Sequence, residues 1–372
     1  MKTFKTVLAV LAVLLVSGCS SLPLQRARTA FYAGNLESAD QVLKNCNDVS
    51  GKDRLLCHME KGLILFYLKD YETSTRALLN AENLMKTQDQ ISVADQSSAV
   101  LVNDSVTAYK GEYSERLWVH TFLMMNFLLQ NRIESALVEA KQALEVIDKY
   151  PKALAGDHFT RALIGLCFEN MNLFDDARIE YEKLSGEAGT NLFLPGTLPR
   201  DRGELVLFVA QGHIPVKVSA DIILPPSIRI SVPRYMGQSP PALPMTIRSR
   251  QADLSPEILS TDMGEVAKKS LDERSAEIFS RQAIRAGAKE AIAREAGKRS
   301  DVAEGVARII LFLLEQADTR SWETLPGRLS LVRVQLEPGL HDLEISTGYS
   351  QPIRLNTLEI PAGARAYQSV RF

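Results

Sequence analysis

Cysteine and histidine are the side chains in which metal, redox or nucleophilic chemistry would first be sought, and this chain has four cysteines and five histidines in 372 residues. Cys57, His58 and Glu60 stand together in "CHMEK", but no second pair of ligands follows at zinc-site spacing. The chain has no Gly-x-Ser-x-Gly elbow, no His-Glu-x-x-His helix and no Gly-x-x-x-x-Gly-Lys phosphate loop. We therefore predict no metal, no cofactor and no enzyme activity, although folding can still assemble a site from distant residues.

The first residues have the layout of a secretory signal. Lys2 and Lys5 precede a nearly unbroken apolar stretch from Thr6 to Val16, which ends in small residues. The stretch is shorter than the roughly 20 apolar residues that a membrane-spanning helix needs. A buried N-terminal helix would explain the apolar stretch, but not the lysines before it or the Ser-Gly-Cys after it. We therefore expect residues 1–18 to be a cleaved signal.

Val16-Ser17-Gly18-Cys19 closely resembles the lipobox of bacterial lipoproteins. The resemblance implies that diacylglycerol is joined to the thiol of Cys19, that the signal is cut before it, and that the new N-terminus is acylated. Two or more acyl chains anchor a protein stably, whereas one does so only weakly. Ser20 stands where the inner-membrane retention signal usually has aspartate. The resemblance therefore implies an outer-membrane lipoprotein whose body lies in the periplasm.

Three cysteines remain for an oxidising compartment. Cys46 and Cys57 lie on either side of "NDVSGKDRLL", a polar turn followed by the start of an apolar helix, so they could bridge neighbouring helices. Their spacing does not show whether the two side chains face each other, and both the bridged and the unbridged state stay open. Cys167 lies in an apolar helical stretch, which indicates a small core residue.

The charge balance gives no sign of a nucleic-acid partner. The whole chain has 43 basic and 45 acidic side chains, and loss of the two signal lysines leaves 41 against 45, a net charge of −4. Domains that bind nucleic acid are strongly basic or carry basic stripes. Hydrophobic residues make up 45% of the chain, enough for a sizeable core, and the length suggests two or three domains.

Four segments between residues 22 and 188 share one design. They are "RARTAFYAGNLESADQVL" (26–43), "MEKGLILFYLKDYETSTRALLNA" (59–81), "FLMMNFLLQNRIESALVEAKQAL" (122–144) and "ALIGLCFENMNLFDDARIEYEKL" (162–184). Each combines an apolar helix, a short polar turn and a second amphipathic helix, with a small residue where the two helices would cross.

These segments resemble tetratricopeptide repeats. Gly62 and Gly165 match the small position in the first helix of that motif, where Ala27 and Met124 stand in the other two segments. The bulky residue after the turn is matched by Leu36, Tyr71, Ile133 and Phe174, the small residue in the second helix by Ala39, Ser74, Ala136 and Ala177, and the later alanine by Ala81 and Ala143. The spacing departs from a strict 34-residue period, because residues 86–116 separate the second and third segments.

The resemblance implies a helical solenoid over residues 19–188 whose concave surface binds a peptide or a segment of an envelope protein. A compact helical bundle without a groove is the alternative. The candidate partner-binding residues are Tyr109, Tyr113, Trp118 and His120, because aromatic side chains are favoured anchors of interfaces. At helical spacing the same residues are also typical of a core. We interpret Glu72, Glu82 and Asp175-Asp176 as solvated carboxylates of the repeat surfaces.

Composition changes at "SGEAGTNLFLPGTLPRDRGE" (185–204), where glycine and proline become frequent and the helical period stops. We place a domain boundary there and assign residues 189–372 to a mixed α+β module, rich in short strands and containing long helices. Asp262 could cap one helix, and "DVAEGVARIILFLLEQADTRSW" (301–322) predicts another, buried against the sheet or touching a partner. Alternating segments on both sides of 337–339 and of 361–363 predict two C-terminal hairpins.

The sequence "LPGR" followed by "LEPGLH" (325–341) is similar to a feature of poorly characterised bacterial envelope lipoproteins that join helical repeats to a β-rich C-terminal module. The genes of that family tend to lie near those of lipoprotein activators of peptidoglycan synthases, so the resemblance points to cell-wall assembly. We predict a lipid-anchored periplasmic adaptor that binds envelope proteins through its repeats. The alternative is a cell-envelope enzyme or glycan-binding protein with its site around His213, Trp322 and His341, which flank predicted strands and turns.

Overall fold

The N-terminal half of the molecule is an array of paired helices. The computed structural model describes residues 22–94, 107–188, 195–225, 228–239, 241–249, 253–298, 300–313, 315–348 and 350–372. Four helical hairpins follow one another: hairpin 1 (α2, Leu22–Tyr32, and α3, Leu36–Val42), hairpin 2 (α4, Arg54–Tyr67, and α5, Tyr71–Ala94), hairpin 3 (α6, Tyr113–Leu129, and α7, Ile133–Lys149) and hairpin 4 (α8, His158–Asn170, and α9, Phe174–Ala188). Two short 3-10 turns, η1 (Cys46–Asp48) and η2 (Gly51–Asp53), join hairpins 1 and 2.

The turns inside the four hairpins share one backbone conformation. Each contains a single residue with positive φ, at 78°, 63°, 57° and 58° for Gly34, Lys69, Asn131 and Asn172. The N–H of the next residue then donates to a carbonyl five positions back, in the pairs Asn35–Ala30, Asp70–Leu65, Arg132–Phe127 and Leu173–Phe168. Such a left-handed residue ends a helix by pairing its last free carbonyls. The four segments are therefore repeats in backbone geometry as well as in sequence.

Close contact between the two helices of a hairpin explains the small residues. A Cβ placed on Gly62 would lie 2.6 Å from the side chain of Leu78, and one placed on Gly165 would lie 2.4 Å from the ring of Tyr181. In the second helices the matching small residues, which are Ala39, Ser74, Ala136 and Ala177, are fully buried. These contacts give the hairpins the tetratricopeptide-like packing that the sequence predicts.

The strands of the second half form two four-stranded sheets and a separate two-stranded ribbon. The inner sheet has the order β10-β1-β7-β6, the outer sheet the order β5-β4-β8-β9, and the ribbon pairs β2 with β3. Their bounds are β1, Gly203–Gln211; β2, Val216–Leu224; β3, Ile228–Met236; β4, Met245–Ser249; β5, Asp253–Leu254; β6, Glu257–Asp262; β7, Arg328–Leu336; β8, Gly339–Thr347; β9, Ile353–Ile360; and β10, Arg365–Arg371. Helices and strands together make a mixed α+β chain.

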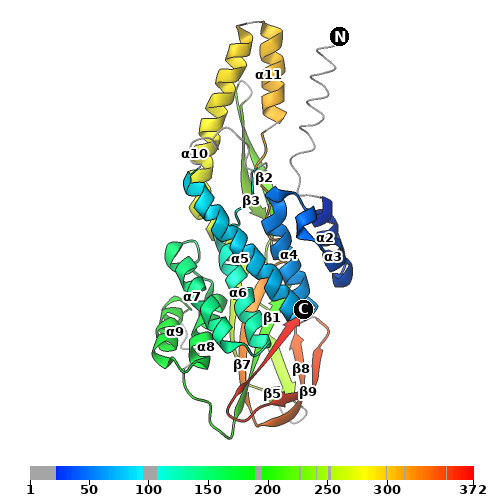
Figure 1. Cartoon of the computed structure of the whole chain (residues 1–372), viewed down its shortest axis with the longest axis vertical. Helices are drawn as coiled ribbons and strands as arrows, with labels where there is room; N and C mark the ends of the chain where they lie inside the picture. Colours follow the sequence, from blue (N-terminus) through cyan, green and yellow to red (C-terminus); the bar gives the residue numbers. More distant parts are fainter. Residues whose placement is uncertain are drawn as a thin grey trace.

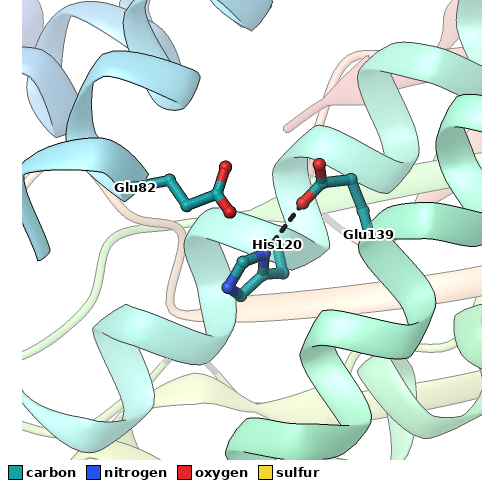
Figure 2. A group of neighbouring side chains, drawn as sticks. All are labelled: Glu82, His120 and Glu139. Carbon is teal, nitrogen blue, oxygen red and sulfur yellow. Dashed lines mark hydrogen bonds and ion pairs between the residues drawn. The ribbon is translucent and has the colours of Figure 1, made fainter. Parts of the chain in front are cut away.

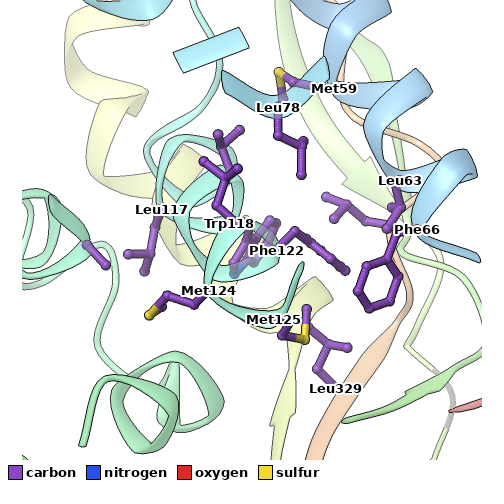
Figure 3. Close-up of a cluster of buried hydrophobic side chains, with 14 of the residues drawn as sticks. Met59, Leu63, Phe66, Leu78, Leu117, Trp118, Phe122, Met124, Met125 and Leu329 are labelled. Atoms are coloured by element: carbon purple, nitrogen blue, oxygen red, sulfur yellow. The ribbon is translucent and has the colours of Figure 1, made fainter. Parts of the chain in front are cut away.

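The inner sheet lies between the helical array and the outer sheet. Every residue of β1 is buried, as expected for a strand covered on both faces. Phe208 and Val206 face the helices and belong to the core that begins at Leu24, whereas Leu205 and Leu207 face the outer sheet. Figure 3 shows how residues of α4, α5 and α6 gather with Leu329 of β7 in the larger core. The array and the strands are therefore packed as one body.

The two C-terminal hairpins predicted from sequence are wrong. β7 pairs with β1 and β6 in the inner sheet, whereas β8 pairs with β4 and β9 in the outer sheet. β9 and β10 are divided between the sheets in the same way, since β10 runs parallel to β1. The turns at 337–338 and 361–364 are corners where the chain changes sheet. Alternating polarity shows that a strand has one buried face, but not which strand lies beside it.

Two helices that lie between β6 and β7 in the chain form a projecting hairpin. α10 (Met263–Gly297) starts at Asp262, whose side chain accepts from the N–H of Glu265, as the sequence predicts. α11 (Asp301–Leu313) returns beside it, and the pair extends away from the rest of the molecule with the β2–β3 ribbon along its base (Figure 1). α11 contains no buried residue, so its predicted burial against the sheet is wrong. Within the described ranges, no helix combines the length and apolarity needed to cross a membrane.

The end of the chain returns to its beginning. Arg371, at the end of β10, places its guanidinium 4.3 Å from the ring centroid of Phe31 in α2 and 4.4 Å from that of Tyr67 in α4. Figure 1 shows the C-terminus beside these N-terminal helices. The first two hairpins are thus completed by the last strand.

Candidate functional site: the filled inner face and the projecting hairpin

The first helices of the hairpins, α2, α4, α6 and α8, present what we name the inner face of the array. The inner sheet covers part of it, and residues 318–325, which we name the inserted segment, cover another part. The segment lies between α11 and β7 and contains neither helix nor strand. Trp322 and Leu325 are nevertheless completely buried.

Arg28 of α2 and Glu60 of α4 hold the backbone of the inserted segment. The Arg28 guanidinium donates to the carbonyl of Ser321 at 2.6 Å. The Glu60 carboxylate accepts from the N–H groups of Glu323 and Thr324 at 3.1 and 3.2 Å. Arg28 and Glu60 also pair with each other, with 2.7 Å between nitrogen and oxygen, and both side chains are buried. Paired burial of this kind satisfies the two charges and the backbone groups together.

Glu115 of α6 holds the next part of the segment. Its carboxylate accepts from the backbone N–H of Trp322 at 2.7 Å, and the hydroxyl of Tyr109 donates to it as well. Burial raises the pKa of Glu115, and nearby Lys217 offsets only part of that rise. The Trp322 ring packs against Phe122, with 5.8 Å between ring centroids. The segment is therefore held through its backbone and through one large apolar side chain.

Arg320 fastens the start of the inserted segment to η2, the turn before hairpin 2. Its guanidinium donates to the carbonyl of Lys52 and to the carboxylate of Asp53, both at 3.1 Å, and pairs with Asp318 at 2.7 Å. Burial alone would raise the pKa of Asp318, but the adjacent Arg320 outweighs it and lowers that pKa. The guanidinium also lies 5.2 Å from the ring centroid of Tyr109.

The inner face is thus filled by the chain itself. Buried side chains that pair with the backbone of an extended segment, with an aromatic anchor between them, are the contacts by which a groove holds a peptide. Here the held segment belongs to the same polypeptide. The open concave surface expected from the repeat resemblance is therefore not available in this structure.

A second buried cluster joins hairpin 4 to the inner sheet. Arg333 of β7 pairs with Glu169 of α8 at 3.0 Å and with Glu204 of β1 at 2.8 Å. Arg365 of β10 pairs with Glu204 at 2.6 Å and also with Glu169. Burial would raise the pKa of Glu204, but Arg333 and then Arg365 outweigh it, so the net effect is a lowered pKa. Two cations and two anions balance, which suits a structural role.

The aromatic candidates of the sequence analysis lie in the core. Tyr109, Trp118 and His120 are buried, and the Trp118 ring N–H donates to Asp157 at 2.8 Å. Tyr113 is half-buried on the same helix as Trp118 and His120. The partner-binding interpretation is therefore wrong for Tyr109, Trp118 and His120, because these side chains are buried inside the folded chain.

The cysteines fall into three situations. Cys19 lies outside the described residues. Cys46 and Cys57 are joined by a disulfide, with 5.7 Å between their Cα atoms, which ties the loop after α3 to α4. A bonded Cys57 offers no thiolate to a metal, so "CHMEK" is not a zinc site. Cys167 is buried in α8 as a free thiol, and its burial raises its pKa.

The structure places the three residues of the alternative site in different surroundings. His213 packs on Phe31 and Tyr32, with 5.7 and 5.0 Å between ring centroids. Trp322 lies beneath α6 in the core, and His341 sits on β8 of the outer sheet, where its Nε2 contacts the carbonyl of Glu337 at 2.8 Å. The Trp322 side chain is enclosed in the core and His341 lies on the outer sheet, so the three side chains do not line one open site.

The sequence predicts that the helix within 301–322 is buried or touches a partner, but it does not identify the exposed face of α11. Val302, Val306, Ile309 and Leu313 expose 76%, 44%, 62% and 37% of their surface. Their spacing of four, three and four residues places them along one side of the helix. The opposite side, with Ala303, Ala307, Ile310 and Leu311, is half-buried against α10. A helix that is apolar on two sides normally has neighbours on both.

The sequence matches no protein-family model and no curated protein. Among solved structures, it is similar to the crystal structure of MamA, with 14% identity over 45% of this chain and 77% of that one and a TM-score of 0.31. It is also similar to the apo form of RapI, with 11% identity over 45% of this chain and 43% of that one and a TM-score of 0.34. For the Rap conjugation gene regulator of plasmid pLS20 in complex with the Phr* peptide, identity is 13%, coverage 44% and 41%, and the TM-score 0.30. The chain spans less than half of either Rap protein, and similarity this weak carries no functional argument.

Proposed function

We propose that this protein is a lipid-anchored scaffold of the bacterial cell envelope, which binds a helical segment of another envelope protein along α11. The observation that carries the proposal is that α11 contains no buried residue and aligns four exposed apolar residues on the side that faces away from α10. The proposed anchor is the acylated Cys19 in the outer membrane, with the folded body in the periplasm. A role in cell-wall assembly follows from the lipoprotein resemblance alone.

An amphipathic helix fits the free side of α11. Val302, Val306, Ile309 and Leu313 follow the alternating spacing of four and three residues by which two helices form a coiled-coil seam. On its other side α11 is fixed to α10 by Arg308, which pairs with Glu290 of α10 at 2.6 Å. Glu304, one turn earlier on α11, also pairs with Arg308 at 2.8 Å. The exposed residues are therefore presented by a supported helix. This surface replaces the filled inner face as the proposed binding site for a protein partner.

The proposed anchor would place hairpin 1 near the membrane. Two residues, Ser20 and Ser21, separate Cys19 from the start of α2, and the three residue steps from Cys19 to Leu22 span at most about 10 Å. A chain held in this way would keep its first helices close to the bilayer and leave the projecting α10–α11 hairpin free to meet a partner.

Photo-crosslinking in intact cells tests the binding surface. A photoreactive amino acid at Val306 should trap a specific envelope protein, whereas one at Glu295, exposed on α10 of the same hairpin, should not. Val302→Glu with Ile309→Glu should abolish the capture without lowering the melting temperature, because both side chains are exposed. Equal capture at Val306 and Glu295, or none at either, would contradict the proposal.

Fatty-acid labelling tests the anchor separately. The natural chain should incorporate labelled palmitate and fractionate with the outer membrane, and Cys19→Ser should lose both properties. Labelling that persists in Cys19→Ser would refute the lipid attachment and leave the α11 surface to be judged on its own crosslinks.

A further inference from the structure

Glu82, His120 and Glu139 form a buried cluster on three different helices of the array. Glu82 lies on α5, His120 on α6 and Glu139 on α7, and each residue exposes 6% of its surface or less. Nδ1 of His120 lies 2.8 Å from Oε2 of Glu139. Each of the three residues has one atom that could ligate a metal, and these three atoms lie within 4.8 Å of one another. Figure 2 shows both carboxylates directed toward the imidazole. The sequence predicts a solvated carboxylate at Glu82, and the burial of Glu82 corrects that prediction.

The cluster holds two carboxylates against one imidazole. The further cation is Lys86, whose Nζ lies 2.5 Å from the carboxylate of Glu82 and donates to Gln142 at 2.8 Å. The Lys86 side chain is 57% exposed, so it approaches from the surface and can withdraw into water. Withdrawal of Lys86 would leave two buried carboxylates beside a ring nitrogen. Together these three groups could serve as ligands of a cation.

The same position in hairpin 4 shows how an ordinary ion pair is built there. Arg161 and Glu180 lie 41 residues after His120 and Glu139, in the same register of the repeat, and pair at 2.9 Å. The position that corresponds to Glu82, counted from the bulky residue after the turn, is Leu144 in α7. Hairpin 3 therefore has histidine where hairpin 4 has arginine. Hairpin 3 also faces the carboxylate of Glu82 from hairpin 2, whereas hairpin 4 faces Leu144 from hairpin 3 at the corresponding position.

Both differences favour a metal ion. Arginine stays protonated and offers no lone pair, whereas a neutral imidazole is a metal ligand. An additional carboxylate supplies a third ligand and a second negative charge. Zinc takes one nitrogen and two carboxylate oxygens at about 2.0–2.2 Å and commonly completes its shell with water. An imidazole among the donors favours zinc over calcium or magnesium, which prefer oxygen ligands.

We propose that Glu82, His120 and Glu139 bind one Zn²⁺ ion that ties hairpin 2 to hairpin 3. Binding would replace the proton shared between His120 and Glu139 and the ammonium of Lys86. The proposed role is structural, because the ligands come from three helices inside the array. This inference is independent of the partner surface on α11.

Zinc titration of the full chain, purified in detergent without a histidine tag and stripped with chelator, tests the site. Calorimetry should show one Zn²⁺ per chain, and zinc should raise the melting temperature, because a ligand that binds only the folded state stabilises it. His120→Arg copies the hairpin 4 pair, so it should fold without zinc yet lose the binding and the thermal shift. Glu82→Gln should weaken binding by about tenfold or more, as expected for the loss of a charged ligand.

Glu180→Gln is the matched control, since it removes a buried carboxylate from the equivalent pair in hairpin 4. It should retain the full zinc stoichiometry and the thermal shift. The proposal is overturned if the natural chain binds no zinc, if His120→Arg binds it equally well, or if Glu180→Gln loses it to the same extent as Glu82→Gln.

Discussion

The backbone N–H of Trp322 donates to the carboxylate of Glu115 at 2.7 Å, although 207 residues separate them along the chain. One residue belongs to the inserted segment and the other to the first turn of α6. The contact satisfies a buried backbone donor that has no strand or helix partner. It therefore makes the order of the inserted segment depend directly on the helical array.

Glu115→Ala should destabilise the whole chain. The substitution leaves the N–H of Trp322, the N–H of Glu112 and the hydroxyl of Tyr109 without their acceptor. Each buried group left unpaired costs about 1–3 kcal/mol, so we expect a loss of roughly 3 kcal/mol or more in the free energy of unfolding. Urea unfolding followed by tryptophan fluorescence measures it, because Trp118 and Trp322 are the two tryptophans of the chain. Glu145→Ala, on the exposed side of α7, should change stability by less than about 0.5 kcal/mol.

Two glycines of hairpin 4 should respond in opposite directions to the same change. Gly165→Ala places a Cβ 2.4 Å from the buried ring of Tyr181, and overpacking of this kind costs about 1–3 kcal/mol. Gly186→Ala meets nothing within 4 Å and should stabilise α9 by up to about 1 kcal/mol, because alanine restricts the unfolded chain. The melting temperatures of both variants, compared with that of the natural chain, measure the two effects. An equal effect of the two changes would mean that the helices of hairpin 4 are not in close contact.

Removal of the disulfide should weaken the connection between hairpins 1 and 2. Cys46 and Cys57 are 11 residues apart, and closure of a loop of that size contributes about 3 kcal/mol by restricting the unfolded chain. Cys46→Ala with Cys57→Ala should therefore lower the melting temperature, and a reducing agent should lower that of the natural chain. The double variant should not respond to the reducing agent. A response there would show that the reductant acts elsewhere.

The Glu204 cluster should give the stability of the chain a specific dependence on pH. The folded pKa of Glu204 lies below its ordinary value of 4.5, so its carboxylate stabilises the fold above that pH and loses this effect as the pH falls through the folded pKa. Glu204→Gln should cost about 3 kcal/mol at pH 7, and the deficit relative to the natural chain should shrink below about pH 5. Urea unfolding at a series of pH values measures the difference. Glu72→Gln, on the exposed side of α5, should show a difference near zero at every pH.

The repeats could be predicted because their signals are local. A small residue nine positions before a bulky one marks three of the four hairpins, as in Gly62 with Tyr71 and Gly165 with Phe174. The polar Asp262 before an Ala-rich amphipathic stretch marks the start of α10 in the same way. Periodicity, turns and caps are set by neighbours in sequence, which is why one sequence suffices for them.

Long-range pairing could not be predicted from the same signals. Apolar character indicated that α11 is buried, but its outer side has no neighbour in the described part of the chain. The turn at 337–338 looked like that of a hairpin, yet it changes sheets. The cluster at Glu82, His120 and Glu139 did leave a trace in the sequence. An alignment of the repeats places His120 opposite Arg161 and Glu139 opposite Glu180. The histidine at a position where the next repeat has arginine is the sequence signal that could have indicated the cluster.

The meeting of Arg371 with Phe31 and Tyr67 has a consequence for the order of folding. A polypeptide is synthesised from its N-terminus, so the four hairpins exist before the inserted segment and β10 have been made. During that interval the inner face exposes Phe122 and the buried charges Glu60 and Glu115 to solvent. Contacts between such distant residues form slowly, and partly folded chains with exposed apolar surface attract chaperones or aggregate. A chain that stops short of its last strand would therefore remain a client of the quality-control machinery, however well its repeats form.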